Sequence, residues 1–216
     1  MGIIIPLRMK IIPHLSALCA ALVIGFASSA SAATVAYSVT GEASITSDPN
    51  GEVSLGFFFT MNADRYVSAL GMYDAGLDGL AVSHAVGIYS NAGVLLASAT
   101  VPGGTTGTLV GDHRYISLVS QLFLASGQTY LISAVTAAST DGYQILDGPG
   151  LTVDPAITIG QSKYNYTGGN GLGFPTGDTI PGRTHVTPNF LTVIPEPGGA
   201  VLLLAGLGLV CVRMRR

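Results

Sequence analysis

The sequence has no tryptophan, two cysteines and few charged residues. Only 10% of its 216 residues are charged, with nine Lys and Arg against twelve Asp and Glu. A protein that binds nucleic acid needs an excess of cations to neutralise phosphates, and this chain has none. Disordered chains combine low hydrophobicity with high charge, which does not fit a composition that is 48% hydrophobic. The composition therefore predicts a folded protein with no nucleic-acid partner.

Both cysteines, Cys19 and Cys211, lie in apolar stretches close to the ends of the chain. The long segment between Ala33 and Pro195 has no cysteine, so no disulfide can form within it. Its stability must come from a packed core, and about 160 residues are enough to build one. Because the strongly apolar stretches are confined to the ends, we expect the middle of the chain to be a soluble domain.

The N-terminal segment has the three parts of a secretory signal. Arg8 and Lys10 precede an apolar run from Ile11 to Phe26, and small residues follow. Residues 1–32 are therefore predicted to be a helical signal peptide, delivered by the Sec machinery. An uncleaved membrane anchor and a buried helix are the alternatives. The best match to a signal peptidase site comprises Ala30, Ala32 and Ala33.

The C-terminal segment, residues 193–216, is predicted to be a short membrane anchor. A helix over about 198–212 would span roughly 22 Å, less than the roughly 30 Å of a bilayer core. The prolines before it keep the preceding peptide extended and accessible to a processing enzyme. Cationic residues close the chain and favour the cytoplasm, which places the domain on the opposite side of the membrane. These cations are Arg213, Arg215 and Arg216.

The motif Pro195-Glu196-Pro197, the short apolar helix and the terminal arginine cluster together resemble the PEP-CTERM sorting signal. This resemblance implies recognition by an exosortase, a membrane-embedded transpeptidase-like enzyme of Gram-negative bacteria that make extracellular polysaccharide. It also implies cleavage at or just after the motif, after transient anchoring in the inner membrane. The protein would then reach the cell surface or the exopolysaccharide matrix. An unprocessed single-span anchor is the alternative.

The middle of the chain has the pattern of short β-strands. Glycine is frequent, and no stretch combines apolar residues at helical spacing with an absence of helix breakers. Alternating apolar residues between Val53 and Phe59 share one face, and Asn91-Ala92-Gly93 is typical of a hairpin turn. The predicted strands are Thr34–Thr40, Glu52–Thr60, Tyr66–Tyr73, His84–Ser90, Val94–Thr100, Arg114–Val119, Gln128–Thr136, Tyr143–Leu146 and Phe190–Val193.

This pattern predicts an all-β fold over residues 33–192, an antiparallel β-sandwich for which a jelly roll is one arrangement. Residues 54–100 loosely resemble sandwich domains of bacterial surface proteins. Residues 147–188 are rich in Gly and Pro, and we expect a long loop there that is either functional or mobile.

Carboxylates near two turns suggest a calcium site. Asp74 and Asp78 flank glycines between two strands, and Asp112 would complete the oxygen shell with backbone carbonyls. The segment lacks the bidentate Glu of an EF-hand, so a solvated turn is the simpler interpretation. A hydrolase would need Asp112, His113 and a serine to meet in the fold. Because no catalytic motif is present, the sequence predicts that the protein is not an enzyme.

Tyr164 and Tyr166, separated by Asn165, suggest a surface on which sugars could stack. The absence of tryptophan weakens this hypothesis, and tyrosines that pack over a sheet edge are the alternative. The leading interpretation is an exported surface or matrix protein with a structural or adhesive role and no cofactor. A calcium- or carbohydrate-binding module with the same targeting is the second interpretation, and a surface hydrolase is the third.

Overall fold

The computed structural model describes residues 32–41, 43–46, 51–136, 141–169, 171–179 and 181–195. The predicted signal peptide and anchor helices lie outside these ranges, together with Ala30, Glu196, Pro197 and the three terminal arginines. Within the described ranges the chain forms only β-strands and turns, and it contains no helix with the length and hydropathy of a membrane span.

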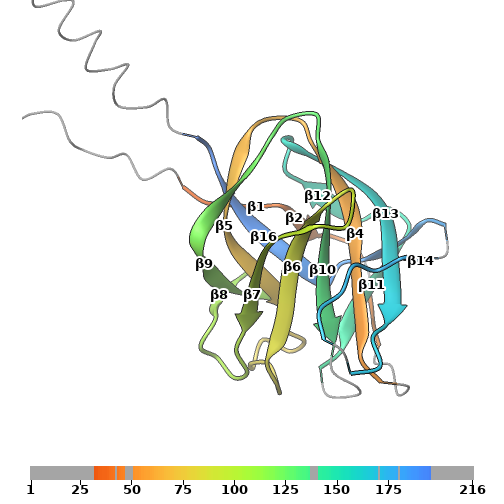
Figure 1. The fold of residues 1–216 in the computed structure, drawn as a ribbon. Coiled ribbons are helices and arrows are strands. Elements are labelled where there is room, and N and C mark those ends of the chain that lie inside the picture. Colours follow the sequence, from red (N-terminus) through yellow and green to blue (C-terminus); the bar gives the residue numbers. More distant parts are fainter. Residues whose placement is uncertain are drawn as a thin grey trace, which may run out of the picture. The chain divides into compact units, whose positions relative to one another are not determined.

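Sixteen strands occur in the described residues. Figure 1 shows how they are arranged and labels most of them. Their bounds are β1 Thr34–Val35, β2 Tyr37–Val39, β3 Ala43–Thr46, β4 Val53–Met61, β5 Arg65–Tyr73, β6 His84–Ser90, β7 Leu95–Val101, β8 Thr108–Val110, β9 His113–Leu124, β10 Thr129–Thr136, β11 Tyr143–Asp147, β12 Leu151–Val153, β13 Ile157–Tyr166, β14 Gly177–Asp178, β15 Arg183–His185 and β16 Pro188–Val193.

The strands form two large antiparallel sheets and two small ones. One large sheet has the order β1-β16-β5-β9-β8, and the other has the order β14-β13-β4-β10-β6-β7. The small sheets are β15-β11-β3 and β12-β2. Two large sheets that share one core are the arrangement of a β-sandwich, so the predicted all-β antiparallel fold is confirmed.

The core lies between the two large sheets. Leu55, Phe57 and Phe59 of β4 are fully buried, as the alternation in the sequence predicts. Across the core, Phe190 of β16 places its ring 4.8 Å from the ring of Phe59, measured between centroids. This contact joins the two sheets across the core.

The outer face of the six-stranded sheet is covered by a strap, residues 171–175. The carbonyl oxygen of Gly173 accepts hydrogen bonds from the hydroxyls of Ser54 and Ser133, at 2.9 and 3.1 Å. The ring of Phe174 packs against Tyr89, with centroids 5.6 Å apart. Because the strap supplies a partner for each hydroxyl, both serines are buried without losing hydrogen bonds.

All nine predicted strands overlap observed strands, although the segment Thr34–Thr40 is divided between β1 and β2. Gly93 has a φ of 82°, as the predicted hairpin turn requires. The long loop expected at residues 147–188 is wrong, because this region contains β12, β13, β14 and β15. Many residues of β13 are polar and exposed, so its own sequence has a weak strand pattern. The segment forms a strand because it pairs with the apolar β4.

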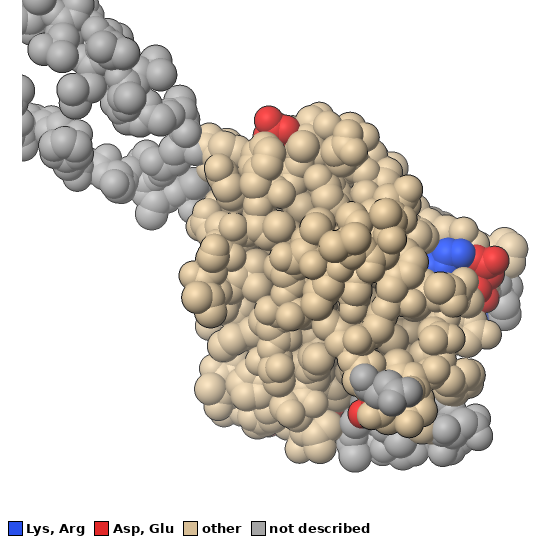
Figure 2. Space-filling model, in the orientation of Figure 1, with Lys and Arg blue, Asp and Glu red and all other residues tan. Residues whose placement is uncertain are grey.

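Charged side chains are sparse on the face of the domain shown in Figure 2, where uncharged residues cover most of the surface. Large apolar side chains are also exposed elsewhere in the chain, among them Val94, Leu95 and Val119. Charged residues are therefore few on this face of the domain as well as in its core.

The Phe59–Phe190 contact gives a test of the two-sheet core. Replacing Phe190 with alanine removes a fully buried ring and should lower the free energy of unfolding by about 3–5 kcal/mol in urea titrations. Phe123→Ala is the matched control, since Phe123 is 47% exposed and should lose much less stability. Equal losses in the two variants would contradict this description of the core.

Candidate functional site

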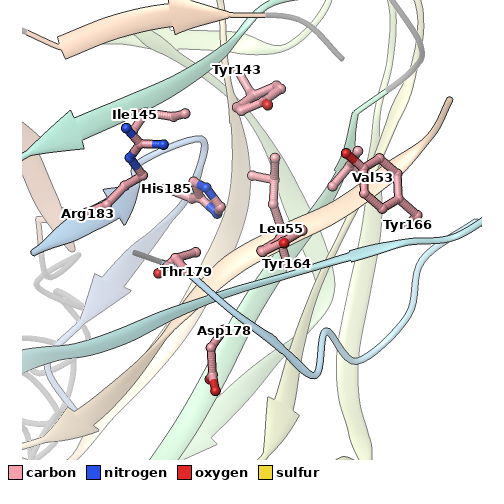
Figure 3. Close-up of a pocket in the computed structure, with 10 residues that line it drawn as sticks. All are labelled: Val53, Leu55, Tyr143, Ile145, Tyr164, Tyr166, Asp178, Thr179, Arg183 and His185. Atoms are coloured by element: carbon pink, nitrogen blue, oxygen red, sulfur yellow. The ribbon is translucent and has the colours of Figure 1, made fainter. Parts of the chain in front are cut away.

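A cleft of about 230 Å³ lies where the six-stranded sheet meets the small sheet β15-β11-β3. We call it the aromatic cleft. Figure 3 shows its side chains arranged around one central space, with the rings of Tyr143, His185 and Tyr166 on different sides. The lining residues are Val53, Leu55, Tyr143, Ile145, Tyr164, Tyr166, Asp178, Thr179, Arg183 and His185.

Strand geometry brings the two predicted tyrosines together. Tyr164 and Tyr166 are two residues apart on β13, so their side chains point to the same face. Their rings are nearly perpendicular, with centroids 6.2 Å apart. The register of β13 on β4 sets Tyr164 opposite Leu55 and Tyr166 opposite Val53, which form an apolar floor.

Two further rings in the cleft were not predicted from the sequence. The imidazole of His185 lies 6.1 Å from the rings of both Tyr143 and Tyr164, measured between centroids. β11 supplies Tyr143 and β15 supplies His185, and these strands pair with each other. Only the aromatic character of Tyr143 and His185 marks them in the sequence, because their meeting depends on long-range strand pairing.

The charged groups at the rim of the cleft are paired. The guanidinium of Arg183 donates two hydrogen bonds to Asp147, from Nε to Oδ1 at 2.7 Å and from Nη2 to Oδ2 at 3.2 Å. The ammonium of Lys163 forms an ion pair with Asp178. Each of these two cations therefore has a carboxylate beside it.

His185 is the one histidine of the cleft, and it is 6% exposed. Burial lowers its pKa to about 4. The hydrogen bond to the carbonyl oxygen of Lys163 opposes this lowering, and the nearby charge of Arg183 adds a smaller lowering effect. Its Nδ1 lies 3.4 Å from the carbonyl oxygen of Lys163, which can only accept a hydrogen bond. The ring is neutral at pH 7, and with the proton on Nδ1 its Nε2 is an acceptor.

The structure brings two of the three candidate calcium ligands together, since the backbone N–H of Asp74 donates to the carbonyl oxygen of Asp112 at 2.9 Å, but both carboxylates have other partners. Asp74 is buried and accepts a 2.6 Å hydrogen bond from Nε of Arg114 and hydrogen bonds from the backbone N–H of Gly79. Asp112 accepts a 2.6 Å hydrogen bond from Nδ1 of His113, while Asp78 is exposed. Among the residues described, no group of three or more His, Cys, Asp or Glu could hold a metal ion. These contacts do not favour a calcium site, which stays a prediction.

His113, the partner of Asp112, belongs to a packed interior. His113 is 1% exposed, and its ring lies 5.8 to 6.2 Å from the rings of Tyr37, Tyr73 and Tyr115. The hydroxyl of Tyr37 donates to the carbonyl oxygen of Pro188 at 2.8 Å. Because the imidazole is enclosed in this way, a substrate has no route to it in this structure, and the arrangement favours a structural role.

The two ends of the described domain lie side by side. β1 pairs with β16, so Thr34 is opposite Thr192, with the exposed Ala32 and Ala33 just before β1 and Pro195 just after β16. The hydroxyl of Thr34 donates to Asp154, shortly before β13 begins at Ile157. Tyr166 closes that ten-residue strand, about 30 Å further along. Tyr166 and the aromatic cleft that it lines are therefore at the end of the domain opposite the chain ends. Figure 1 shows the arrowhead of β13 pointing away from β1.

A family described as "Domain of unknown function (DUF4082)" matches residues 39–185. The matched segment runs from the last residue of β2 to the last residue of β15, and it contains every residue that lines the aromatic cleft. No curated protein matches the chain.

Arg114 gives a test of the buried ion pair. Besides Asp74, it donates to the carbonyl oxygens of Leu77, Thr105 and Gly107. Arg114→Ala leaves a buried carboxylate without its cation and should lower the free energy of unfolding by about 3–5 kcal/mol. Arg183→Ala removes a solvent-exposed pair and should change stability little. If urea unfolding gave the two variants similar losses, the structural role of the Asp74–Arg114 pair would be refuted.

The lowered pKa of His185 predicts a loss of stability in mild acid. The unfolded chain binds a proton at His185 near pH 6.5, whereas the folded chain binds it only near pH 4. Stability from this group is thus complete above about pH 6.5 and falls toward pH 4, by on the order of 3 kcal/mol. In His185→Gln, urea unfolding between pH 7 and 4 should lose this part of the slope. An unchanged slope would show that His185 is not kept neutral by burial.

Proposed function

We propose that this chain, which belongs to the DUF4082 family, is an exported protein of the bacterial cell surface or exopolysaccharide matrix, with a structural or adhesive role. The observation that carries the proposal is the position of the two ends of the domain. Both leave at one end, beside each other, and the aromatic cleft lies at the other end. A domain held by its C-terminus would therefore present the cleft away from the membrane.

The processing steps follow from the terminal sequences. In this proposal the Sec machinery and signal peptidase remove residues 1–32, and residues 198–212 hold the domain transiently in the inner membrane of a Gram-negative bacterium. An exosortase then recognises the tail. Ile194 is exposed, and Pro195, the last residue that the structure describes, lies outside β16, which supports access of an enzyme to the motif.

The surface of the domain supports contact with uncharged material. Few charged side chains interrupt the face in Figure 2, so adhesion there would depend on hydrogen bonds and apolar contacts. The proposal includes no enzymatic activity and no cofactor. We also propose that the strands of the β-sandwich have a jelly-roll arrangement. The carbohydrate-binding alternative is favoured over the calcium-binding one by the aromatic cleft.

Replacing Pro195, Glu196 and Pro197 with alanine tests the sorting step. In the native host, the variant should keep its full-length C-terminus and accumulate in the inner membrane, because the exosortase would lack its motif. Intact-mass and C-terminal peptide analysis of the inner-membrane, surface and medium fractions measures both properties.

Pro181→Ala is the control, since Pro181 is an exposed proline away from the motif, and this variant should be processed as the wild type is. Unchanged processing of the triple-alanine variant would count against recognition by an exosortase. A full-length wild-type protein in the inner membrane would instead support a simple single-span anchor.

A further inference from the structure

The aromatic cleft has the size of a site for a small ring. Its volume of about 230 Å³ is below the roughly 300–1,000 Å³ of pockets for drug-sized ligands. The floor is apolar, with Val53 and Leu55 at 3% and 0% exposure. Tyr166, in contrast, is 51% exposed, so a face of this ring is accessible to a ligand that enters from solvent. The cleft therefore fits one or two ring-sized units of a larger molecule that extends outside it.

The charges around the cleft favour an uncharged ligand. Arg183 is held by both oxygens of Asp147, and Lys163 is paired with Asp178. An anionic ligand would have to compete with a carboxylate for either cation, and a cationic ligand would meet a guanidinium or ammonium beside each carboxylate. The neutral His185 adds no charge at pH 7. Phosphates, uronates and amines would thus find each of these charged groups already in an ion pair.

Polar groups between the aromatic walls are suited to hydroxyl groups. The hydroxyl of Thr179 donates to the carbonyl oxygen of Ser162 at 3.2 Å, which leaves its oxygen lone pairs as acceptors. Nε2 of His185 is a second acceptor. A ligand that satisfies this wall must carry hydrogen-bond donors while it presents an apolar face to the tyrosines.

We propose that the aromatic cleft binds an uncharged pyranose ring of a polysaccharide. The C–H face of the sugar lies against Tyr166 and Tyr164, because weakly positive C–H groups are attracted to the negative face of an aromatic ring. The sugar hydroxyls donate to Thr179 and to Nε2 of His185 on the polar wall. The biological meaning of this inference rests on the proposed surface location, whereas the binding itself does not.

The position of the cleft is consistent with a polymeric ligand. Its lining comes from β4, β11, β13, β14, β15 and the residue after β14, at the end of the domain opposite β1 and the end of β16. Chain on either side of the bound ring can therefore continue into solvent. A soluble monosaccharide would occupy the same position with fewer contacts, so we expect polymers to bind more tightly than their monomers.

Affinity electrophoresis of the purified full chain tests the proposal. The protein is kept in a zwitterionic detergent, since alkyl glycosides carry sugar head groups that would compete for the cleft. Native gels contain one of three uncharged polysaccharides, hydroxyethyl cellulose, galactomannan or dextran, or the polyuronate alginate. We expect retardation by at least one uncharged polymer and none by alginate.

Substitutions of the exposed tyrosine connect the binding to the cleft. Tyr166→Ala and Tyr164→Ala should each weaken binding about tenfold, as the loss of one aromatic contact implies. Tyr166→Phe and Tyr166→Trp should bind as the wild type does, because each retains a ring. Phe123→Ala removes an exposed aromatic outside the cleft and should leave binding unchanged. Thermal unfolding of each variant confirms that it is folded.

Three results would overturn the inference. They are no retardation by any of the three uncharged polymers, equal retardation by alginate, and undiminished binding of Tyr166→Ala and Tyr164→Ala. None of these results bears on sorting, which is measured in the host by fractionation. Conversely, a protein that binds polysaccharide but stays unprocessed in the inner membrane would refute the proposed location and leave the cleft assignment intact.

Discussion

The pairing of β13 with β4 is the constraint on which the rest of the structure depends. β4 is buried on both faces, by the second large sheet on one side and by the strap on the other. Its apolar residues fix its position in the core, and β13 takes its register from β4. That register sets Tyr164 and Tyr166 over Leu55 and Val53 and so builds one wall of the aromatic cleft. In a segment without disulfides, the packing that stabilises the domain also positions its candidate site.

The few charges of the domain are used mainly in pairs that fasten its loops. Of the four Lys and Arg among the described residues, Arg114, Lys163 and Arg183 form ion pairs with Asp. Asp141 adds a pair with His84 and accepts hydrogen bonds from the backbone N–H groups of Ala81 and Val82. Burial would raise the pKa of Asp141, but these hydrogen bonds outweigh burial and lower it. These pairs use most of the cations of the described domain inside the fold.

Short sequence patterns predicted the features of the fold that depend on residues close together in the sequence. Alternation and turn residues predicted nine strands and the hairpin at Gly93, and a short motif predicted that Tyr164 and Tyr166 would act together. The same reasoning missed β13, whose polar sequence resembles a loop until an apolar neighbour is supplied. It also missed Tyr143 and His185, which strand pairing brings to the cleft from other segments. Asp74 looked like a metal ligand because its cation, Arg114, is 40 residues away in the sequence. The predicted signal peptide helix, anchor helix and arginine cluster lie outside the described residues.

The paired charges and the neutral His185 of the aromatic cleft affect how the binding of a ligand depends on salt and pH. Contacts between a sugar ring and tyrosines, and hydrogen bonds to uncharged groups, are screened little by salt, whereas ion pairs at a surface weaken as ionic strength rises. An adhesive site of this kind would keep its affinity in surroundings of variable salt concentration. The affinity should fall in acid, because protonation of His185 near pH 4 places a second cation beside Arg183. Protonation also turns Nε2 of His185 from an acceptor into a donor. The burial that keeps this imidazole neutral therefore preserves both the stability of the fold and the polarity of the cleft.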